Sequence, residues 1–435
     1  MTHVLIIGAG PAGLGAAQVL AQAGARVTVV ERQPQAGGVP RLCGHSPFGL
    51  REFHRLLGGR AYAHRLAQDA TAAGAQILLN QSVTAIDPGP TVHIATPQGT
   101  ITLTPDRILL ATGAREASRA ERLLPGERPL GIITTGALQD LWFARGAVPF
   151  RRPALLGSEL VAMSAILTCR QAGAMPVAVI EAAAQPIARA PFRWLPKTLG
   201  IPLLTCTRIA DIIATDGRLS QLVLCDDAGK TSVIDCDGLV LTGCFRPESG
   251  LARMCGLAID PATQGPIVDQ SGRTSHPAIY AAGNLLRGVE TAGQCWAEGR
   301  AIALAMLSDL PPKAAIEVKP GAGIRYVMPQ RLSPGSAAAL PALQYRLDRP
   351  ARGTLTLTDA QNHRIESLHI ASAPERRLAL NLADLTLQNV RGPLTLALER
   401  DAEKWTPVFR VNHATTEKLA RDDVPLKHHP ALKAD

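Results

Sequence analysis

The chain has 435 residues, of which 46% are hydrophobic and 19% are charged, so it is long and apolar enough to fold into two or three ordinary domains. Its formal net charge is +9, but the basic residues are scattered and only 3% of residues are aromatic, which argues against nucleic-acid binding and favours an anionic cofactor, an acidic substrate or an acidic partner. No apolar stretch reaches transmembrane length and no Lys/Arg-rich leader precedes the first apolar run, so we expect a cytoplasmic protein without an integral membrane segment.

Residues 4–31 carry the most informative pattern of the chain. An apolar run is followed by the turn Gly-Ala-Gly-Pro-Ala-Gly, an alanine-rich helical stretch and a second apolar run that ends at Glu31. This order predicts a dinucleotide-binding βαβ unit. Gly8 permits the tight turn, Gly10 lets the backbone approach a pyrophosphate, and Gly13 lets the helix pack against the strand. The helix N-terminus would face the phosphates, and the Glu31 carboxylate would accept hydrogen bonds from ribose hydroxyls.

The eight cysteines never approach a Cys-x-x-Cys spacing. This argues against a redox-active disulfide motif, a zinc ribbon and an iron–sulfur cluster held by a compact motif. Most of the cysteines lie in apolar runs, where a buried thiol behaves as a small hydrophobic side chain. We therefore predict no metal site.

A second nucleotide-type domain is predicted inside the first. The apolar runs at 107–113 and 236–243 both end in Thr-Gly, and between them residues 153–181 repeat the order of strand, turn, helix and strand. Another strand with a glycine turn follows at 275–284. We therefore assign the first domain to residues 1–118 and 246–311, and the inserted domain to residues 119–245.

The residue pattern of the sequence changes after about residue 312. Pro311-Pro312 and Pro320-Gly321 predict a linker, and alternating segments such as 343–347, 353–357 and 394–398 predict a small β-sandwich over 315–400. Residues 401–435 have the composition of a loosely ordered tail, in which His428-His429 is better explained by solvation than by metal binding. The fold class is therefore α/β, with two Rossmann-like domains, the second inserted in the first, and a C-terminal β-sandwich, which we interpret as a docking module.

These pieces together resemble the two-dinucleotide-binding-domain flavoproteins of the pyridine nucleotide–disulfide oxidoreductase-like superfamily, over residues 1 to about 310. The motifs that carry the resemblance are GAGPAG with Glu31, Ala-Thr-Gly at 111–113, Thr-Gly at 242–243 and Tyr-Ala-Ala-Gly-Asn at 280–284. GGVPRLCGH at 37–45, FGL at 48–50 and AYA at 61–63 look closer to the non-disulfide branch. That branch contains flavoproteins associated with glycerol-3-phosphate-dehydrogenase-like enzymes and subunits of the hydrogen cyanide synthase, opine oxidase and hydroxyproline dehydrogenase type.

The resemblance implies that the first domain binds FAD. Asn284 departs from the superfamily, which usually has Asp there, but an amide still donates and accepts hydrogen bonds, so we expect altered FAD contact rather than loss. Residues 289–293 would begin a helix whose positive end faces the flavin pyrimidine. The FAD-contacting positions carried over are Gly8, Gly10, Pro11, Ala12, Gly13, Glu31, Arg32, Gly37, Gly38, Val83, Ala111, Thr112, Gly113, Gly283, Asn284, Thr291 and Ala292.

The inserted domain departs further from the family pattern. Its turn reads Gly157-Ser158-Glu159-Leu160-Val161-Ala162, so a carboxylate stands at the second glycine position. Glu159 would crowd and repel a pyrophosphate there. We expect a domain that keeps the fold but binds NAD(P) poorly or not at all, and the alternative, a shifted turn with a surviving site, stays open.

The candidate catalytic residues follow the Gly37-Gly38 turn. Cys43 and His45 would supply a thiolate or a proton relay near the flavin, or would simply pack a loop. Arg41 would anchor a carboxylate or phosphate, or would be a solvated surface residue. Glu290 and Trp296, which follow the Tyr-Ala-Ala-Gly-Asn turn, would border the flavin, and Trp296 would equally well be a core residue.

The predicted function is that of an FAD-dependent oxidoreductase within a dehydrogenase complex. It would oxidise a small organic substrate such as an amino acid, an amine or a polyol phosphate, and pass electrons to a partner, either a second flavoprotein or an iron–sulfur protein. Two alternatives stay open: an NAD(P)H-dependent flavin reductase that feeds a partner, and a non-catalytic scaffold that holds FAD structurally.

Overall fold

The computed structural model describes residues 1–308, 315–334, 338–373, 376–387 and 390–401. The N-terminal unit is built on a five-stranded parallel sheet in which β1 (His3–Ile7) is central, flanked by β7 (Arg107–Leu110) and β2 (Arg26–Val30). The outer strands are β18 (Ile279–Ala281) and β3 (Gln76–Leu78). Four of the five residues of β1 are buried, as expected of a parallel strand covered on both faces. This explains why its sequence is a continuous apolar run.

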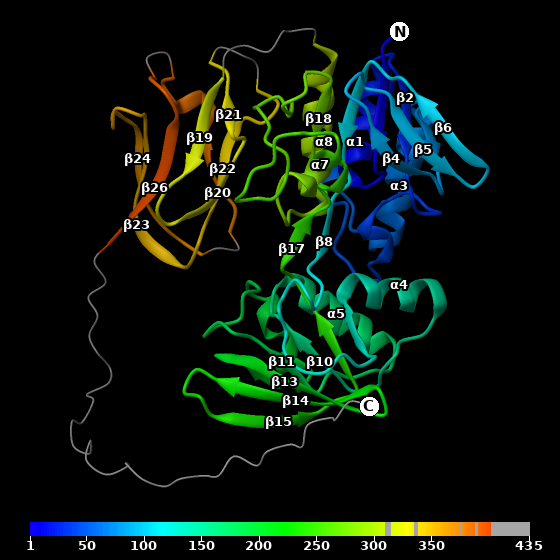
Figure 1. The fold of residues 1–435 in the computed structure, drawn as a ribbon, viewed down its shortest axis with the longest axis vertical. Helices are drawn as coiled ribbons and strands as arrows, with labels where there is room; N and C mark the ends of the chain where they lie inside the picture. Colours follow the sequence, from blue (N-terminus) through cyan, green and yellow to red (C-terminus); the bar gives the residue numbers. More distant parts are fainter. Residues whose placement is uncertain (309–314, 335–337, 374–375, 388–389, 402–435) are drawn as a thin grey trace, which may run out of the picture.

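Helices α1 (Pro11–Gln22) and α8 (Ala292–Leu307) pack side by side in this unit, although they lie at opposite ends of its sequence (Figure 1). Helix α3 (Gly59–Ala72) packs against α1, and the short η1 (Val39–Leu42) and α2 (Leu50–Phe53) precede it. An antiparallel sheet of β4 (Ser82–Ile86), β5 (Val92–Thr96) and β6 (Gly99–Leu103) completes the unit, together with the short α7 (Gly250–Met254) and η3 (Gly283–Leu285).

The inserted unit repeats the same architecture. Its parallel sheet has the order β12 (Leu203–Leu204), β11 (Ala178–Ile180), β10 (Pro153–Leu156), β16 (Gly238–Leu241) and β9 (Ile132–Thr134). The unit also contains α4 (Thr135–Arg145), α5 (Leu160–Gln171), η2 (Phe192–Trp194) and α6 (Leu195–Thr198). An antiparallel sheet of β13 (Thr207–Thr215), β14 (Arg218–Asp226) and β15 (Thr231–Asp235) follows. The chain crosses between the two units through the paired strands β8 (Ala114–Glu116) and β17 (Phe245–Pro247) (Figure 1).

The C-terminal unit consists of two sheets around one apolar core. One sheet has the order β21 (Arg331–Leu332), β19 (Ile316–Pro320), β26 (Leu394–Arg400), β23 (Ala351–Thr358) and β24 (Arg364–Ser372). The other has the order β20 (Ile324–Met328), β22 (Ala342–Leu347) and β25 (Leu378–Asn381), after which comes η4 (Leu382–Asp384). In β23 every second residue from Gly353 to Leu357 is buried, which is the period-two pattern that predicted a sandwich.

The predicted fold class, two Rossmann-like parallel sheets with a C-terminal β-sandwich, is confirmed. One detail was wrong: Pro320-Gly321 is not linker, because Pro320 ends β19 and Gly321 donates a backbone hydrogen bond to Leu396 in β26. Pro311-Pro312 and the tail beyond residue 401 lie outside the described residues. Within the described ranges, no helix is long and apolar enough to cross a membrane, and no group of three or more His, Cys, Asp and Glu side chains could hold a metal ion.

Candidate cofactor site

The glycine-rich turn lies between β1 and α1. Gly8 has a φ of +107°, and a Cβ atom at Gly13 would overlap the Gly8 carbonyl oxygen, so the helix approaches the turn as closely as the sequence predicts. Gly10 precedes Pro11 at the start of α1, where no side chain caps the helix. A Cβ atom at Gly10 would meet nothing within 4 Å, so the space beside the positive end of α1 is open. This cradle fits a pyrophosphate.

Glu31 is held at the end of β2 by backbone donors. Its Oε2 accepts a hydrogen bond from Ala9 N and its Oε1 from Gln33 N, both at 2.9 Å. A carboxylate has about four lone-pair positions, so the oxygens keep acceptor capacity for ribose hydroxyls. Arg32 beside it is exposed. The arrangement therefore fits the adenosine half of FAD.

Two further loops border the turn. Gly37 N donates to Ala9 O at 2.7 Å, and a Cβ atom at Gly38 would lie 2.8 Å from Gly10 Cα, so the Gly37-Gly38 pair runs along the turn as predicted. On the other side, Ala111 N donates to Ile7 O at 2.9 Å at the end of β7. The next two residues bind the chain where it returns from the inserted unit: Thr112 Oγ1 donates to Glu248 O at 2.9 Å, and Gly113 O accepts from Glu248 N at 2.8 Å. Val83 lies in β4, half-buried and paired with Ile94 of β5.

Asn284 closes a loop of its own chain. Its Oδ1 accepts a hydrogen bond from Glu290 N at 2.6 Å, and its Nδ2 donates to Glu290 O at 3.3 Å. An aspartate would keep the first bond but could not donate the second. The amide therefore has a structural explanation besides the predicted contact with FAD. Gly283, the preceding residue, packs against Ala12 of α1 and donates its N–H to Glu298 Oε1 at 2.8 Å.

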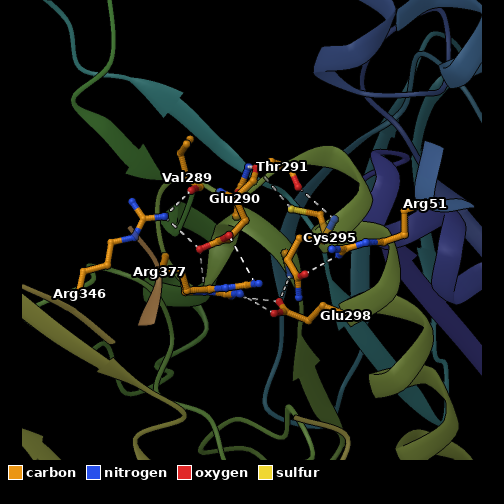
Figure 2. A network of polar contacts seen from close by, with 12 residues as sticks. Arg51, Val289, Glu290, Thr291, Cys295, Glu298, Arg346 and Arg377 are labelled. Carbon is orange, nitrogen blue, oxygen red and sulfur yellow. Dashed lines mark hydrogen bonds and ion pairs between the residues drawn. The ribbon is translucent and has the colours of Figure 1, made fainter. Parts of the chain in front are cut away.

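The start of α8 contains the predicted residues Thr291 and Ala292, and beside it lie Arg51 and Glu52, which sequence reasoning missed. Thr291 caps the helix by accepting from Gln294 N at 3.4 Å, and Ala292 is the first helical residue. Arg51 donates to Gln294 Oε1 at 2.7 Å (Figure 2), and Glu52 Oε1 lies 2.6 Å from where a Cβ atom of Gly293 would be. No local pattern in the sequence connects the short helix α2 with residues more than 240 positions later in the chain.

Tyr62 supports Glu52 from α3. The hydroxyl donates to Glu52 Oε1 at 2.6 Å, and burial together with this carboxylate raises the pKa of Tyr62 well above its usual range. The phenol is therefore a neutral, permanent donor, which holds Glu52 beside the N-terminus of α8.

Each of the three candidate catalytic residues has its own hydrogen-bond partner. Cys43 is buried, its Sγ contacts Val39 O at 3.7 Å, and burial raises its pKa to about 11, so the thiol is neutral near pH 7. The His45 ring contacts Ser164 Oγ of the inserted unit at 2.7 Å and Ser46 O at 3.2 Å, so both nitrogens have partners other than Cys43. Arg41 donates to Gln33 Oε1 at 3.2 Å. For Cys43 and His45 these contacts favour the loop-packing alternative, and a catalytic role for all three residues stays a prediction.

The equivalent turn of the inserted unit is filled by its own side chains. Glu159 Oε2 accepts from Thr242 Oγ1 at 3.1 Å and lies 2.5 Å from where a Cβ atom of Gly157 would be, so the carboxylate covers the turn at the end of β10. Burial raises the pKa of Glu159 to about 7. Ser158 donates to Glu181 Oε2 at 2.6 Å, so the acidic residue that ends β11 already has a hydroxyl partner from its own domain.

The comparisons with known proteins agree with this architecture. Residues 2–299 match the sequence pattern of the family described as "Pyridine nucleotide-disulphide oxidoreductase". An opine oxidase subunit of Agrobacterium tumefaciens (strain Ach5) is 27% identical over 336 residues, which cover 71% of this chain and 65% of that protein. The alpha subunit of sarcosine oxidase from Rhizobium meliloti (strain 1021) is 25% identical over 364 residues, covering 76% and 33%.

This chain therefore spans less than two thirds of the length of either curated relative. Among solved structures, thioredoxin reductase of T. acidophilum superimposes with a TM-score of 0.60 at 21% identity, covering 71% of this chain and 99% of that one, which shows the fold. Because the family pattern extends across both parallel sheets and the turn between β1 and α1, the chain belongs to the pyridine nucleotide-disulphide oxidoreductase family, whose members bind FAD.

Proposed function

We propose that this chain is the FAD-binding subunit of a multi-subunit dehydrogenase or oxidase. It would oxidise a small organic substrate such as an amino acid, an amine or a polyol phosphate, and pass the electrons to a partner protein, either a second flavoprotein or an iron–sulfur protein. The likeness to proteins named as subunits of opine oxidase and sarcosine oxidase supports this assignment. A cytoplasmic location is part of the same proposal.

The observation that carries the proposal is the position of Glu159. In the N-terminal unit the equivalent residue is Gly10, with open space beside it, whereas the Glu159 carboxylate covers Gly157 and bonds Thr242. Near pH 7 this carboxylate is partly ionised, and its charge would repel a pyrophosphate. The arrangement disfavours NAD(P)H as the electron source, so the electrons would come from another substrate.

The cofactor and the residues around it would have separate roles. FAD, when bound, supplies the two-electron chemistry. The turn between β1 and α1 would hold its pyrophosphate and Glu31 its ribose, and the N-terminus of α8 would face the flavin ring. Asn284 would keep its loop closed.

The test is an anaerobic titration of the purified yellow protein with NADH and with NADPH, monitored in the oxidised flavin band. Persistent colour with both nucleotides, followed by reduction with dithionite, is the expected result. A matched titration of Glu159→Ala should restore saturable NADH binding, because the side chain that fills the turn is removed. Rapid bleaching of the wild-type protein would contradict the proposal.

Such bleaching would favour a second candidate, an NAD(P)H-dependent flavin reductase. The intact parallel sheet of the inserted unit and the acidic Glu181 at the end of β11 are the features that keep it in consideration. A flavin that dithionite cannot reduce would instead favour the scaffold alternative.

A further inference from the structure

The C-terminal unit reaches the loop that precedes α8 through two arginines. Arg346 projects from β22, and Arg377 directly precedes β25, so both come from the same three-stranded sheet. In Figure 2 both guanidinium groups point toward Glu290, one residue before the N-cap of α8. The loop from Asn284 to Thr291 is therefore contacted by the C-terminal unit.

The inner half of this loop is fixed by a buried ion pair. Arg287 donates from Nη2 to Glu298 Oε2 at 2.7 Å and from Nη1 to Glu298 Oε1 at 3.2 Å, and both side chains are only 1% exposed. The same Oε1 accepts the Gly283 N–H. This bidentate pair ties the loop to α8 from within the N-terminal unit.

The outer half depends on the C-terminal unit. Arg346 Nη2 donates both to Val289 O at 2.9 Å and to Glu290 Oε1 at 3.1 Å, while Arg377 Nη1 lies 3.6 Å from Glu290 Oε2. The Glu290 side chain is 8% exposed and that of Arg346 is 13% exposed, so their pair is shielded from water. Arg377, at 31% exposure, is more strongly screened and contributes less.

Removing Arg346 would leave a nearly buried carboxylate with weaker partners. Arg287 Nε lies 3.9 Å from Glu290 Oε1, too far for a hydrogen bond, and Val289 O would lose its donor. Loss of one member of a buried pair is costly because the other charge stays in a poorly solvated place. The segment Val289–Glu290 would move, and with it the bond between Glu290 and Asn284 and the cap at Thr291.

We propose that Arg346 is a positioning residue for FAD: it holds Val289 and Glu290 so that Asn284 and the N-terminus of α8 keep their cofactor-binding geometry. The C-terminal sandwich thus completes the flavin site. This inference rests on the proposed function only in that FAD is the cofactor.

The experiment measures how fast the full-length protein releases FAD, from the rise in flavin fluorescence after dilution, together with the shape of the flavin absorption band. Arg346→Met should release FAD at least about tenfold faster and alter the band. Arg346→Lys should stay within about threefold of wild type, because a single nitrogen makes both wild-type bonds and an ammonium group can replace it. Arg352→Met in β23 is the matched control, since that arginine is 72% exposed in the same unit.

A double-mutant cycle separates this role from general destabilisation. Glu290→Gln should also speed FAD release, and the pair Arg346→Met/Glu290→Gln should release FAD more slowly than the product of the single effects predicts, since both substitutions act on one contact. If Arg346→Met does not fold, Glu290→Gln and Arg346→Lys decide the matter.

Wild-type release and an unchanged band in Arg346→Met or in Glu290→Gln, even with a lower melting temperature, would overturn the inference alone. A wild-type protein that takes up no FAD would overturn both the inference and the proposed function.

Discussion

The two glycine-rich turns differ in the residue at the second glycine position. Gly10 leaves the end of α1 accessible, whereas Glu159 puts a carboxylate over the equivalent turn before α5. The inserted unit keeps its sheet because the apolar strands fold independently of what occupies the turn. The loss of a nucleotide site therefore does not require the loss of the fold.

The raised pKa of Glu159 makes its contribution to stability depend on pH. Its ordinary value is about 4.5 and its value in the folded protein is about 7, so the folded chain binds the proton more tightly than the unfolded chain. The associated stabilisation is fully present below pH 4.5 and is lost as pH rises through 7. Relative to Glu159→Gln, the wild-type free energy of unfolding should fall by at most about 1.4 kcal/mol per pH unit in that window and stay level above it.

Urea denaturation of both proteins at several pH values between 5 and 9 checks this. The charged groups near Glu159, Glu181 and Arg122, are present in both proteins, so the difference reports on the Glu159 carboxyl group and its interactions with them. A difference that is constant across the range would mean that the carboxyl group titrates normally.

The stability of the loop that Asn284 closes should fall when Asn284 is replaced by aspartate. Asn284→Asp removes the donor to Glu290 O and leaves a carboxylate 3.3 Å from that carbonyl oxygen. We expect a loss of about 1 kcal/mol of stability, the typical net value of one hydrogen bond, with faster FAD release. Urea unfolding and flavin fluorescence measure the two effects. Asn284→Ala loses both bonds, so it should be less stable than Asn284→Asp and release FAD faster. An aspartate variant more stable than wild type would contradict this role for the amide.

At the scale of elements, α1 and α8 pack closely because glycines stand where the two helices meet. A Cβ atom at Gly299 would overlap the Ala12 carbonyl oxygen, so Gly299→Ala must push the helices apart. We expect the substitution to lower the free energy of unfolding by about 1–3 kcal/mol, as at other overpacked sites. Gly250→Ala is the matched control, because a Cβ atom there meets nothing within 4 Å. Thermal unfolding of the two variants should differ clearly, and equal melting temperatures would mean that the helix pair can spread at little cost.

The elements that the sequence predicted are those with local signals. The turn between β1 and α1 and the apolar strands of both parallel sheets have patterns within a few residues, and the alternation of β23 and β26 predicted the sandwich. The contacts around α8 have no such pattern. Arg346 and Glu290 are 56 positions apart, and Arg51 and Gln294 are 243 apart, so only the folded chain brings them together. The predicted FAD-contacting residues could be carried over by position, whereas the side chains that hold them in place could not.

At the scale of the whole molecule, the C-terminal sandwich is joined to the N-terminal unit by buried contacts. Gln330 exchanges two hydrogen bonds with the backbone of Val268, and Gln270 exchanges two with the backbone of Ser333. Met328 and Leu340 belong to the core of the N-terminal unit. Because the two units share buried contacts and part of a core, they should behave as one body.

Cutting the chain between the two units tests this directly. A specific protease site introduced within residues 309–314 allows cleavage of the folded protein, and we expect both pieces to elute together in gel filtration with FAD still bound. The buried hydrogen bonds and the shared core hold them without the covalent connection. Adding Gln270→Ala removes two of these bonds and should lower the urea concentration at which the pieces separate. Pieces that separate in buffer alone, with FAD left on the N-terminal piece, would instead establish the sandwich as an independent unit.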